Sequence, residues 1–557
     1  MYKKTAFIIT FALVVSLAFS QKVNSLGVTN LSPSPQKIDA FANTEIIVDF
    51  DAAVSLSTVG NISFRVFGHW SGPASGSFAF ENSDTRIRFI PDNPFFAGEL
   101  ITVYLSSNIT GKVDGFLTGG YSFSFWIKTA PGTMDLSLTQ VIPIRLNGES
   151  QIQSYGSYGG DLNGDGWSDL AIPNEISNDI RVFMNDMTGN YTSFAITPIP
   201  GGSSPSTNDG GDFNNDGIID YAVGNGGNNQ LTCLIGIGNG GFLPAQNYTA
   251  GSSVRGLAIL DLNSDGYDDI ITANRSAGNI SIFINKQDGT FNPAVNMDAG
   301  GSSETSCVAA DANNDGFTDL FVGAYSSKEI ILLLGDGNGN LTFSSKTPCG
   351  GTPWMLAVGD VNGDGNVDVV SANSFSSNAG VIFGDGAGGL LPRVTYPTGN
   401  FALAIDLGDL DGDGDLDLVT SNYNSANWTL YENNGNGIFI NRRTLNSSRS
   451  GSCATLHDRD NDGDLDIAGI DEIDDLLFLF TNYVNCCNLP GDFDNNNGID
   501  IADLTSHVSY LFKEGIPPGC FEESDVDGNC ELNIADLTFR INYVFKGGPA
   551  PSCNDCP

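Results

Sequence analysis

The chain has 557 residues, enough for several domains of ordinary size. Its 65 Asp and Glu residues against 24 Lys and Arg residues give a formal net charge of −41, which argues against nucleic acid and anionic membranes as partners. The 68 glycines and 35 phenylalanines suit a mainly β protein in which tight turns join many short strands.

Residues 1–20 have the pattern of a secretory signal peptide. Lys3 and Lys4 precede an apolar run from Ala6 to Phe19, and the small residues before Gln21 place cleavage after Ser20. A membrane anchor is the alternative, although the run is short for a span of about 20 residues. We therefore expect a secreted protein, extracellular or associated with the cell surface, without membrane insertion and in a compartment where disulfides persist.

Residues 28–129 alternate apolar and polar side chains in short runs separated by turns. The runs cover 45–50, 63–67, 86–90, 101–105 and 121–127. Strands at this spacing predict a β-sandwich of about seven strands. The layout resembles bacterial immunoglobulin-like (Ig-like) domains of surface proteins. We expect this domain to act as a spacer, with His69 and Trp70 as packing or surface residues.

Residues 130–485 contain an acidic loop that occurs seven times. In the loop that begins at Asp409, aspartates stand at positions 1, 3, 5 and 9, and glycine stands at position 6, where the backbone must reach positive φ. Alternate side chains of a curled loop converge on one point, and Ca²⁺ takes six to eight oxygens. The first aspartates are 51, 49, 50, 49, 49 and 49 residues apart. One such cluster would be an ordinary turn, but seven in register indicate calcium loops.

The repeat period predicts the architecture of this region. A typical unit has strands near 256–260, 270–273 and 279–284 and a last strand towards 296, with the acidic loop between the first two. A period near 50 with four strands per unit predicts a seven-bladed β-propeller around a channel. The last unit lacks a fourth strand, whereas residues 136–144 form a strand without a blade. We expect this strand to complete blade 7 and close the ring, leaving no free edge.

The units resemble the FG-GAP repeats (VCBS type) of bacterial secreted proteins and of integrin α-subunit propellers. The resemblance implies that ions bind in hairpin loops on one face, and that loops of the opposite face recognise partners. It also implies that positions 1, 3, 5 and 9 give side-chain oxygens and position 7 a carbonyl oxygen. No glutamate stands at position 12, so we expect water or a bidentate position 9 to supply the remaining oxygens, and a structural role for the ion.

In loop order, the implied calcium ligands at positions 1, 3, 5, 7 and 9 are Asp161, Asn163, Asp165, Trp167, Asp169; Asp212, Asn214, Asp216, Ile218, Asp220; Asp261, Asn263, Asp265, Tyr267, Asp269; Asp311, Asn313, Asp315, Phe317, Asp319; Asp360, Asn362, Asp364, Asn366, Asp368; Asp409, Asp411, Asp413, Asp415, Asp417; and Asp458, Asp460, Asp462, Asp464, Asp466.

Asparagine recurs in one slot after the second strand of the units, and the seven residues in that slot are Asn174, Asn225, Asn274, Ala324, Asn373, Asn422 and Asp471. They could form a ligand-facing ring, but asparagine is also a favoured turn residue, and we favour the turn. Aromatic residues near the same face suit stacking against sugars or wedging between blades. They are Tyr325, Trp354, Phe401, Tyr423 and Trp428.

The tail, 486–557, repeats a second loop with a period of 33 residues, and each copy leads into an apolar helix. The two loop-helix halves resemble a dockerin, a calcium-dependent module that docks onto cohesins. The positions that correspond to ligands are Asp492, Asp494, Asn496, Gly498, Asp500, Asp503; and Asp525, Asp527, Asn529, Glu531, Asn533, Asp536. Positions 10 and 11 are Ile-Ala in both copies, unlike cellulosomal dockerins. A calcium-stabilised terminal domain without a partner is the alternative to a cohesin-like partner.

Six of the ten cysteines lie in the tail, namely Cys486, Cys487, Cys520, Cys530, Cys553 and Cys556. In an exported domain they indicate disulfides, and six cysteines allow 15 pairings, among which the sequence does not choose. A zinc site is the alternative.

No nucleophile, metalloprotease or phosphate-loop signature is present in the sequence. Two hypotheses follow. The first is a secreted, non-catalytic, monomeric calcium-binding protein that mediates adhesion or recognition of an extracellular glycan or protein, with the tail as docking module. The second is a polysaccharide-degrading component, a glycoside hydrolase or lyase, that carries a dockerin.

Overall fold

The computed structural model describes residues 25–113, 115–482, 489–493, 498–513, 518, 521–527 and 532–551, without the side chains of 521 and 522. The predicted signal peptide and the six tail cysteines lie outside these residues. Within them, no helix is long and apolar enough to cross a membrane.

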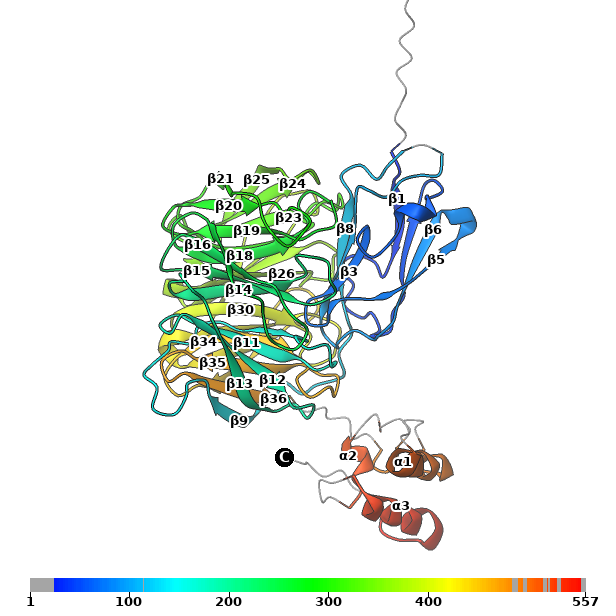
Figure 1. Cartoon of the computed structure of the whole chain (residues 1–557). Helices are drawn as coiled ribbons and strands as arrows, with labels where there is room; N and C mark the ends of the chain where they lie inside the picture. The colour runs from blue at the N-terminus through cyan, green and yellow to red at the C-terminus, as the bar shows by residue number, and fades with distance from the viewer. Residues whose placement is uncertain are drawn as a thin grey trace, which may run out of the picture.

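Residues 28–126 form a sandwich of two four-stranded antiparallel sheets (Figure 1). The outer sheet has the order β1 (Val28–Ser32), β2 (Ile46–Phe50), β6 (Arg86–Pro91), β5 (Gly76–Glu81). The inner sheet has the order β4 (Gly72–Pro73), β3 (Phe64–Gly68), β7 (Leu100–Leu105), β8 (Tyr121–Trp126). Alternate residues such as Ile46, Val48 and Phe50 enter one core, because successive strand side chains point to opposite faces. The sandwich has eight strands rather than about seven.

The repeat region forms seven four-stranded antiparallel sheets, which are the blades of a propeller. The first three are β10 (Tyr158–Gly160), β11 (Asp169–Asn174), β12 (Asp179–Asn185), β13 (Tyr191–Pro198); β14 (Pro205–Gly211), β15 (Asp220–Asn225), β16 (Gln230–Leu234), β17 (Gln246–Thr249); and β18 (Val254–Leu260), β19 (Asp269–Asn274), β20 (Asn279–Phe283), β21 (Val295–Met297).

The next three are β22 (Glu304–Ala310), β23 (Asp319–Ala324), β24 (Glu329–Gly335), β25 (Leu341–Pro348); β26 (Pro353–Gly359), β27 (Asp368–Asn373), β28 (Asn378–Ile382), β29 (Val394–Pro397); and β30 (Ala402–Gly408), β31 (Asp417–Asn422), β32 (Asn427–Glu432), β33 (Ile440–Asn446). The seventh is β34 (Gly451–His457), β35 (Asp466–Asp471), β36 (Leu476–Thr481) and β9 (Ser137–Pro143).

The ring closes as the sequence predicts. Strand β9 pairs antiparallel with β36, with Leu138 opposite Phe480 and Val141 opposite Phe478. The innermost strand of blade 1, β10, contacts both β14 and β34, so the first blade packs against the second and the seventh. The second strand of every blade is buried along its whole length, because neighbouring blades cover both of its faces.

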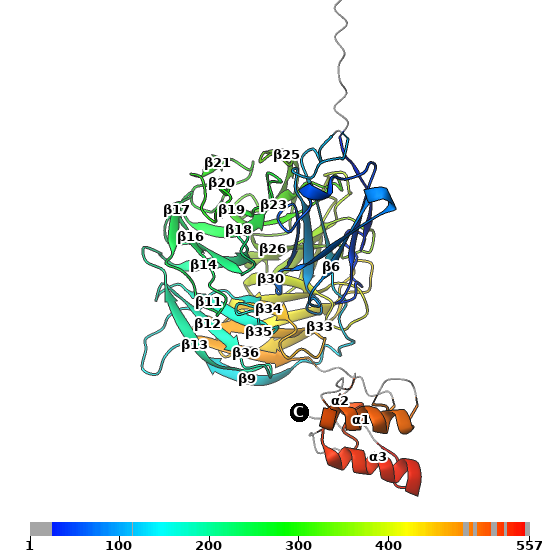
Figure 2. The same ribbon diagram turned by 45° about the vertical axis from the view of Figure 1, so that its right-hand side comes forward.

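The inner sheet of the sandwich packs against one face of the ring (Figures 1 and 2). Arg65 on β3 forms a buried ion pair with Asp268, and the backbone N–H of Ser122 on β8 donates to the carbonyl of Gly316 at 2.6 Å. Both partners in the ring belong to acidic loops, which join the first and second strands of their blades. The sandwich therefore covers the acidic-loop face of the ring.

The described part of the tail contains α1 (Ile501–Lys513), α2 (Phe521–Ser524) and α3 (Ile534–Lys546). Helices α1 and α3 are in contact, and the buried Arg540 on α3 donates to Nδ1 of His507 on α1 at 2.7 Å. The ring of Phe493 stacks on His507 with centroids 4.7 Å apart. The two predicted helices are present and pack as a pair.

Candidate calcium loops and ligand face

The seven acidic loops share one backbone geometry. In each, the first aspartate accepts a hydrogen bond from the N–H of the glycine at position 6, at 2.6 to 3.1 Å. These glycines have positive φ, +95° at Gly414 for example, a conformation that side chains with a Cβ rarely adopt. The loop thus curls around its first carboxylate, as the spacing predicts.

The aspartate at position 9 anchors each loop to its blade. One carboxylate oxygen accepts from a backbone N–H sixteen residues later, at 2.8 or 2.9 Å in all seven loops. In the first six loops the other oxygen accepts from the N–H at position 2. These aspartates are fully buried, and burial with neighbouring carboxylates raises the pKa of Asp417 to about 9 and that of Asp169 to about 8. A cation beside them would favour the charged form instead.

The first four loops differ from the last two in how their carboxylates are satisfied. In the first four, the asparagine at position 3 donates its amide to the aspartate at position 5, as Asn163 does to Asp165 at 2.9 Å. In the last two, position 3 is Asp411 or Asp460, which has no amide to donate. Burial and the neighbouring carboxylate raise the pKa of Asp411 to about 6.

The residues of loops 6 and 7 fit a calcium ion. Carboxylate oxygens of Asp409, Asp411 and Asp413 lie within 4.8 Å of one another, and the same holds for Asp458, Asp460 and Asp462. Buried carboxylate oxygens without a hydrogen-bond partner occur in both loops, on Asp409, Asp415, Asp458, Asp460 and Asp464. Buried acceptors without partners are costly, and a hard divalent cation would satisfy them.

Loop 7 carries a positively charged side chain of its own. Position 2 is Arg459, whose buried guanidinium lies 3.4 Å from the Asp466 carboxylate and donates to the carbonyl of Gly189 and the hydroxyl of Thr481. The other loops have an apolar residue at position 2. The position 9 carboxylate of blade 7 is therefore already in an ion pair, which the spacing of aspartates did not indicate.

In the tail, the structure brings together Asp525, Asp527 and Asp536, whose carboxylate oxygens lie within 4.8 Å of one another. Asp503 of the first half accepts from the N–H of Phe493 at 2.7 Å, and Asp536 accepts from that of Asp527 at 3.3 Å. Each position 12 aspartate thus reaches back to its loop. Four of the predicted ligands, Asp494, Asn496, Asn529 and Glu531, lie outside the described residues.

The recurring asparagines stabilise turns rather than face a ligand. All five are fully buried, and their amide groups donate within their own blade. Asn274, for example, donates to Asn279 at 2.9 Å and to Ser281 at 2.8 Å. In blade 4, Ala324 replaces the asparagine and the buried carboxylate of Glu304 lies opposite it in the strand pair.

The variant Asn274→Ala tests this turn role. We expect it to lower the free energy of unfolding by about 1–3 kcal/mol, because buried partners lose their donor. Chemical denaturation measures the loss, with Asn338→Ala on an exposed turn as the control. A fully stable variant with altered ligand binding would contradict the turn role.

Five aromatic residues and one arginine meet on the face opposite the acidic loops. Each of them lies just after the second strand of a blade or at the start of a first strand. Strand β19 illustrates the placement: the acidic loop lies at its Asp269 end, and Arg275 follows its other end. Consecutive ring centroids lie 5.1 to 6.3 Å apart, and Phe375 is 72% exposed. We call this set the aromatic patch: Arg275, Tyr325, Trp354, Phe375, Phe401 and Tyr423.

A polar network lies beside the aromatic patch. The indole N–H of Trp354 donates to the hydroxyl of Tyr155 at 2.5 Å, joining blade 5 to blade 1. The amide of Gln153 donates both to Glu175 at 2.9 Å and to Glu472 at 2.8 Å. Glu175 also pairs with Arg255 at 2.7 Å. Burial and the neighbouring Glu175 raise the pKa of Glu472 to about 8.

Sequence reasoning found four residues of the patch but missed Arg275 and Phe375. A signal was present: the residues that follow the recurring asparagine slot include Glu175, Arg275, Tyr325, Tyr423 and Glu472. Trp428, by contrast, fits the second alternative for these aromatic residues, wedging between blades, and takes no part in the patch. It is fully buried between blades, meets Phe478 at a tilt and Phe480 edge to face, and its indole N–H donates to the carbonyl of Cys453 at 2.7 Å.

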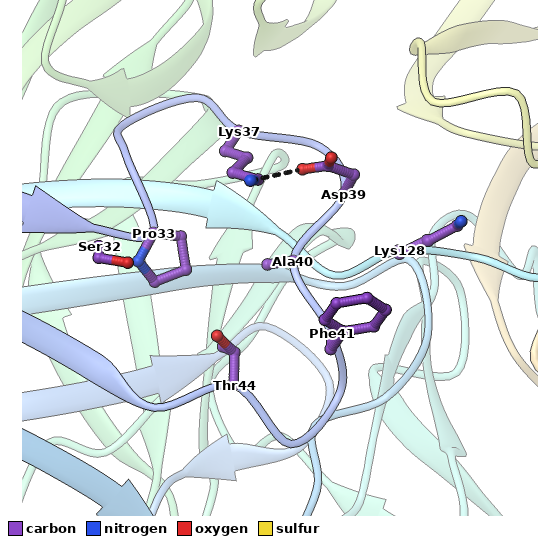
Figure 3. A pocket seen from close by; sticks show the side chains of 8 residues that line it. All are labelled: Ser32, Pro33, Lys37, Asp39, Ala40, Phe41, Thr44 and Lys128. Carbon is purple, nitrogen blue, oxygen red and sulfur yellow. Dashed lines mark ion pairs between the residues drawn. The ribbon is translucent and has the colours of Figure 1, made fainter.

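Two hollows lie elsewhere. A cavity of about 350 Å³ between the sandwich and the inner strands is lined by Asp209, Asp406 and His69 among others, and burial raises the pKa of Asp406 to about 6. A shallower hollow of about 200 Å³ on the sandwich is shown in Figure 3. There Lys37 pairs with Asp39 at 3.1 Å, both side chains are exposed, and Lys128 points away from them (Figure 3).

A serine and a histidine also meet inside the ring. Ser168 and His457 share a hydrogen bond of 2.8 Å between Oγ and Nδ1. Both residues are fully buried, and burial lowers the pKa of His457 to about 3. The pair therefore belongs to the packing between blades 7 and 1.

Solved structures with a similar shape share little sequence with this chain. They include BBS1N in complex with ARL6DN (11% identity, 63% of this chain and 98% of that chain covered, TM-score 0.46). Virginiamycin B lyase from Staphylococcus aureus has 13% identity, 62% and 99% coverage and a TM-score of 0.43. An Agrocybe aegerita lectin that recognises non-reducing terminal N-acetylglucosamine has 18% identity, 54% and 83% coverage and a TM-score of 0.38. Likenesses this remote carry no inference about ligand or activity.

No curated protein sequence matches the chain. The family model described as "FG-GAP-like repeat" matches six overlapping stretches, 161–223, 212–272, 261–322, 311–371, 360–420 and 409–469. Each stretch begins at the first aspartate of one loop and ends beyond the next loop, so the six contain all seven loops. Together they span 161–469, more than half of the 557 residues. The chain therefore belongs to the FG-GAP-like repeat family.

Proposed function

We propose that this chain is an exported, non-catalytic calcium-binding protein that recognises an extracellular glycan or protein with the open face of its propeller. The observation that carries the proposal is the aromatic patch. Its rings lie on the face opposite the acidic loops, while the sandwich covers the loop face. An exposed cluster of rings beside polar groups suits a sugar or the side chains of a partner protein.

Calcium is the cation that the loops suit best, because their donors are carboxylate, amide and carbonyl oxygens. Asp409, Asp411 and Asp413 would hold an ion in loop 6, with Asp417 beside them. The ion would supply positive charge against clustered carboxylates and fix the loops that contact the sandwich. Its role in this proposal is structural, and the ligand binds elsewhere.

The sandwich, which resembles Ig-like domains of surface proteins, would cover the acidic-loop face and leave the opposite face of the ring free for a partner. The tail would serve as the docking module. Its dockerin-like character is supported by the paired loop-helix halves and by Ile501, Phe512, Ile534 and Phe545, which are 58–63% exposed on α1 and α3. An apolar surface of this kind suits a cohesin-like partner.

A second candidate is polysaccharide cleavage, and one observation favours it. Glu472 is buried with a raised pKa of about 8, while Glu175 nearby is ion-paired with Arg255. Two carboxyl groups in contrasting environments are the arrangement that glycosidases use for an acid and its partner. Glu472 is 4% exposed, which favours the structural alternative.

Glycan-array binding in calcium and in chelator, alongside release of reducing ends from the same glycans, separates the two candidates. Calcium-dependent binding without release supports recognition. We expect Phe375→Ala to weaken binding about tenfold, by analogy with the roughly 1–3 kcal/mol that a nucleic-acid base loses with its stacking ring. The control is Phe343→Ala, which removes a half-exposed ring on β25. Release of reducing ends that is lost in Glu472→Gln would overturn the non-catalytic proposal.

A further inference from the structure

Arg275 is held in an unusual environment on the open face. Its guanidinium carbon lies 4.2 Å from the ring centre of Tyr325 and 4.8 Å from that of Trp354. Contact with ring faces fixes the plane of the guanidinium and leaves its N–H groups directed outward at the edges. A fixed fork of donors is the group that best recognises a carboxylate, because two parallel hydrogen bonds can form at once.

No carboxylate in the described part of the chain takes those donors. Among the residues that the structure describes, Arg275 has neither an ion pair nor a side-chain hydrogen bond. Two other arginines at this face are paired, Arg255 with Glu175 and Arg449 with Asp474. The patch therefore offers one uncompensated positive charge among five rings.

We propose that the aromatic patch binds a saccharide that bears a single carboxylate, of the uronic-acid class, with Arg275 on the carboxylate and the exposed rings against the sugar faces. This inference rests on the proposed function and narrows its ligand. The faces of a pyranose ring are apolar enough to stack on Phe375 and Tyr423. The carboxylate of a uronic acid projects from the edge of the sugar ring, where the N–H groups of the Arg275 guanidinium can reach it.

The charge of the whole chain limits the ligand further. A protein with a net charge of −41 repels a polyanion at long range, so a polymer of uronates gains little from one arginine. A terminal or isolated acidic residue in an otherwise neutral glycan avoids that repulsion. The ligand is therefore a glycan end or branch with one acidic sugar.

The test compares two immobilised oligosaccharides that differ only in their terminal residue, glucuronic acid in one and glucose in the other. With the full chain in calcium, we expect the acidic form to bind about 10 to 100 times more tightly, as a charge-assisted pair of hydrogen bonds contributes roughly 1.5–3 kcal/mol. Arg275→Gln should remove this preference while leaving the weaker binding of the glucose form unchanged.

Matched variants separate this inference from the proposed function. Arg442→Gln, exposed on β33, the outermost strand of blade 6, should change nothing, and a thermal midpoint for each variant confirms its fold. Phe375→Ala should weaken binding of both sugars. If both sugars bind equally, and Phe375→Ala but not Arg275→Gln abolishes binding, the acidic ligand is overturned while recognition by the patch is kept. If neither variant changes the binding of either sugar, both this inference and the patch as the recognition site are overturned.

Discussion

Removing calcium should lower the thermal midpoint of the ring by more than any single substitution does. A site adds about 2.7 kcal/mol to stability when the free calcium concentration is 100 times its dissociation constant. Seven such sites would together exceed the 5–15 kcal/mol that a typical domain has in total. Without the ion, loops 6 and 7 keep buried carboxylate oxygens that have no partner. Calorimetry in millimolar calcium and in excess chelator measures the difference.

A matched variant shows whether the effect comes from the loops. Asp364 at position 5 accepts the N–H of Asn366 at 2.9 Å through one oxygen, and an asparagine there keeps that acceptor while it removes the charge. We expect Asp364→Asn to melt at a lower temperature than the natural chain in calcium and at the same temperature in chelator. A midpoint that chelator leaves unchanged in the natural chain would rule out a structural role for calcium.

The repeat made the ring predictable from sequence. Seven loops with nearly equal spacing fixed the number of blades, and the count of strands in the last unit showed that residues 136–144 must complete it. These inferences rest on local patterns that recur within about 50 residues. The choice between turn and ligand for the asparagines also followed from local chemistry, and their buried amide groups agree with it.

Contacts between distant segments could not be predicted in this way. Arg65 and Asp268 are separated by 203 residues, and neither lies in a motif that names its partner. The aromatic patch is similar, because Arg275 meets Tyr325 and Trp354 only once three blades are packed in a ring. For the same reason the sequence left two alternatives open for Trp428, since its context does not distinguish a residue between blades from one on a face.

The ion pair between the sandwich and the ring should be the largest single-residue contribution to their contact. The side chains of Arg65 and Asp268 are each 4% exposed, with one donor–acceptor distance of 2.7 Å. Among the residues that the structure describes, Asp268 otherwise accepts only the N–H of Asp212, at 3.1 Å. Arg65→Met would leave that carboxylate buried without a counter-charge, at a cost of about 3–5 kcal/mol. Position 8 of the other loops carries no charge, so no other loop can replace the pair.

We expect Arg65→Met to release the sandwich from the ring before either domain unfolds, because the lost interaction lies between them. Limited proteolysis of the segment 130–135 measures the release, since Ala130 and Gly132 are held there by hydrogen bonds to loops 7 and 6. The double variant Arg65→Met with Asp268→Leu is the control, and it should recover most of the protection because a well-packed apolar pair can replace a buried ion pair at little cost. Equal cleavage of the single variant and the natural chain would mean that the hydrogen bonds of Ser107, Ser122 and the linker hold the two domains together without the pair.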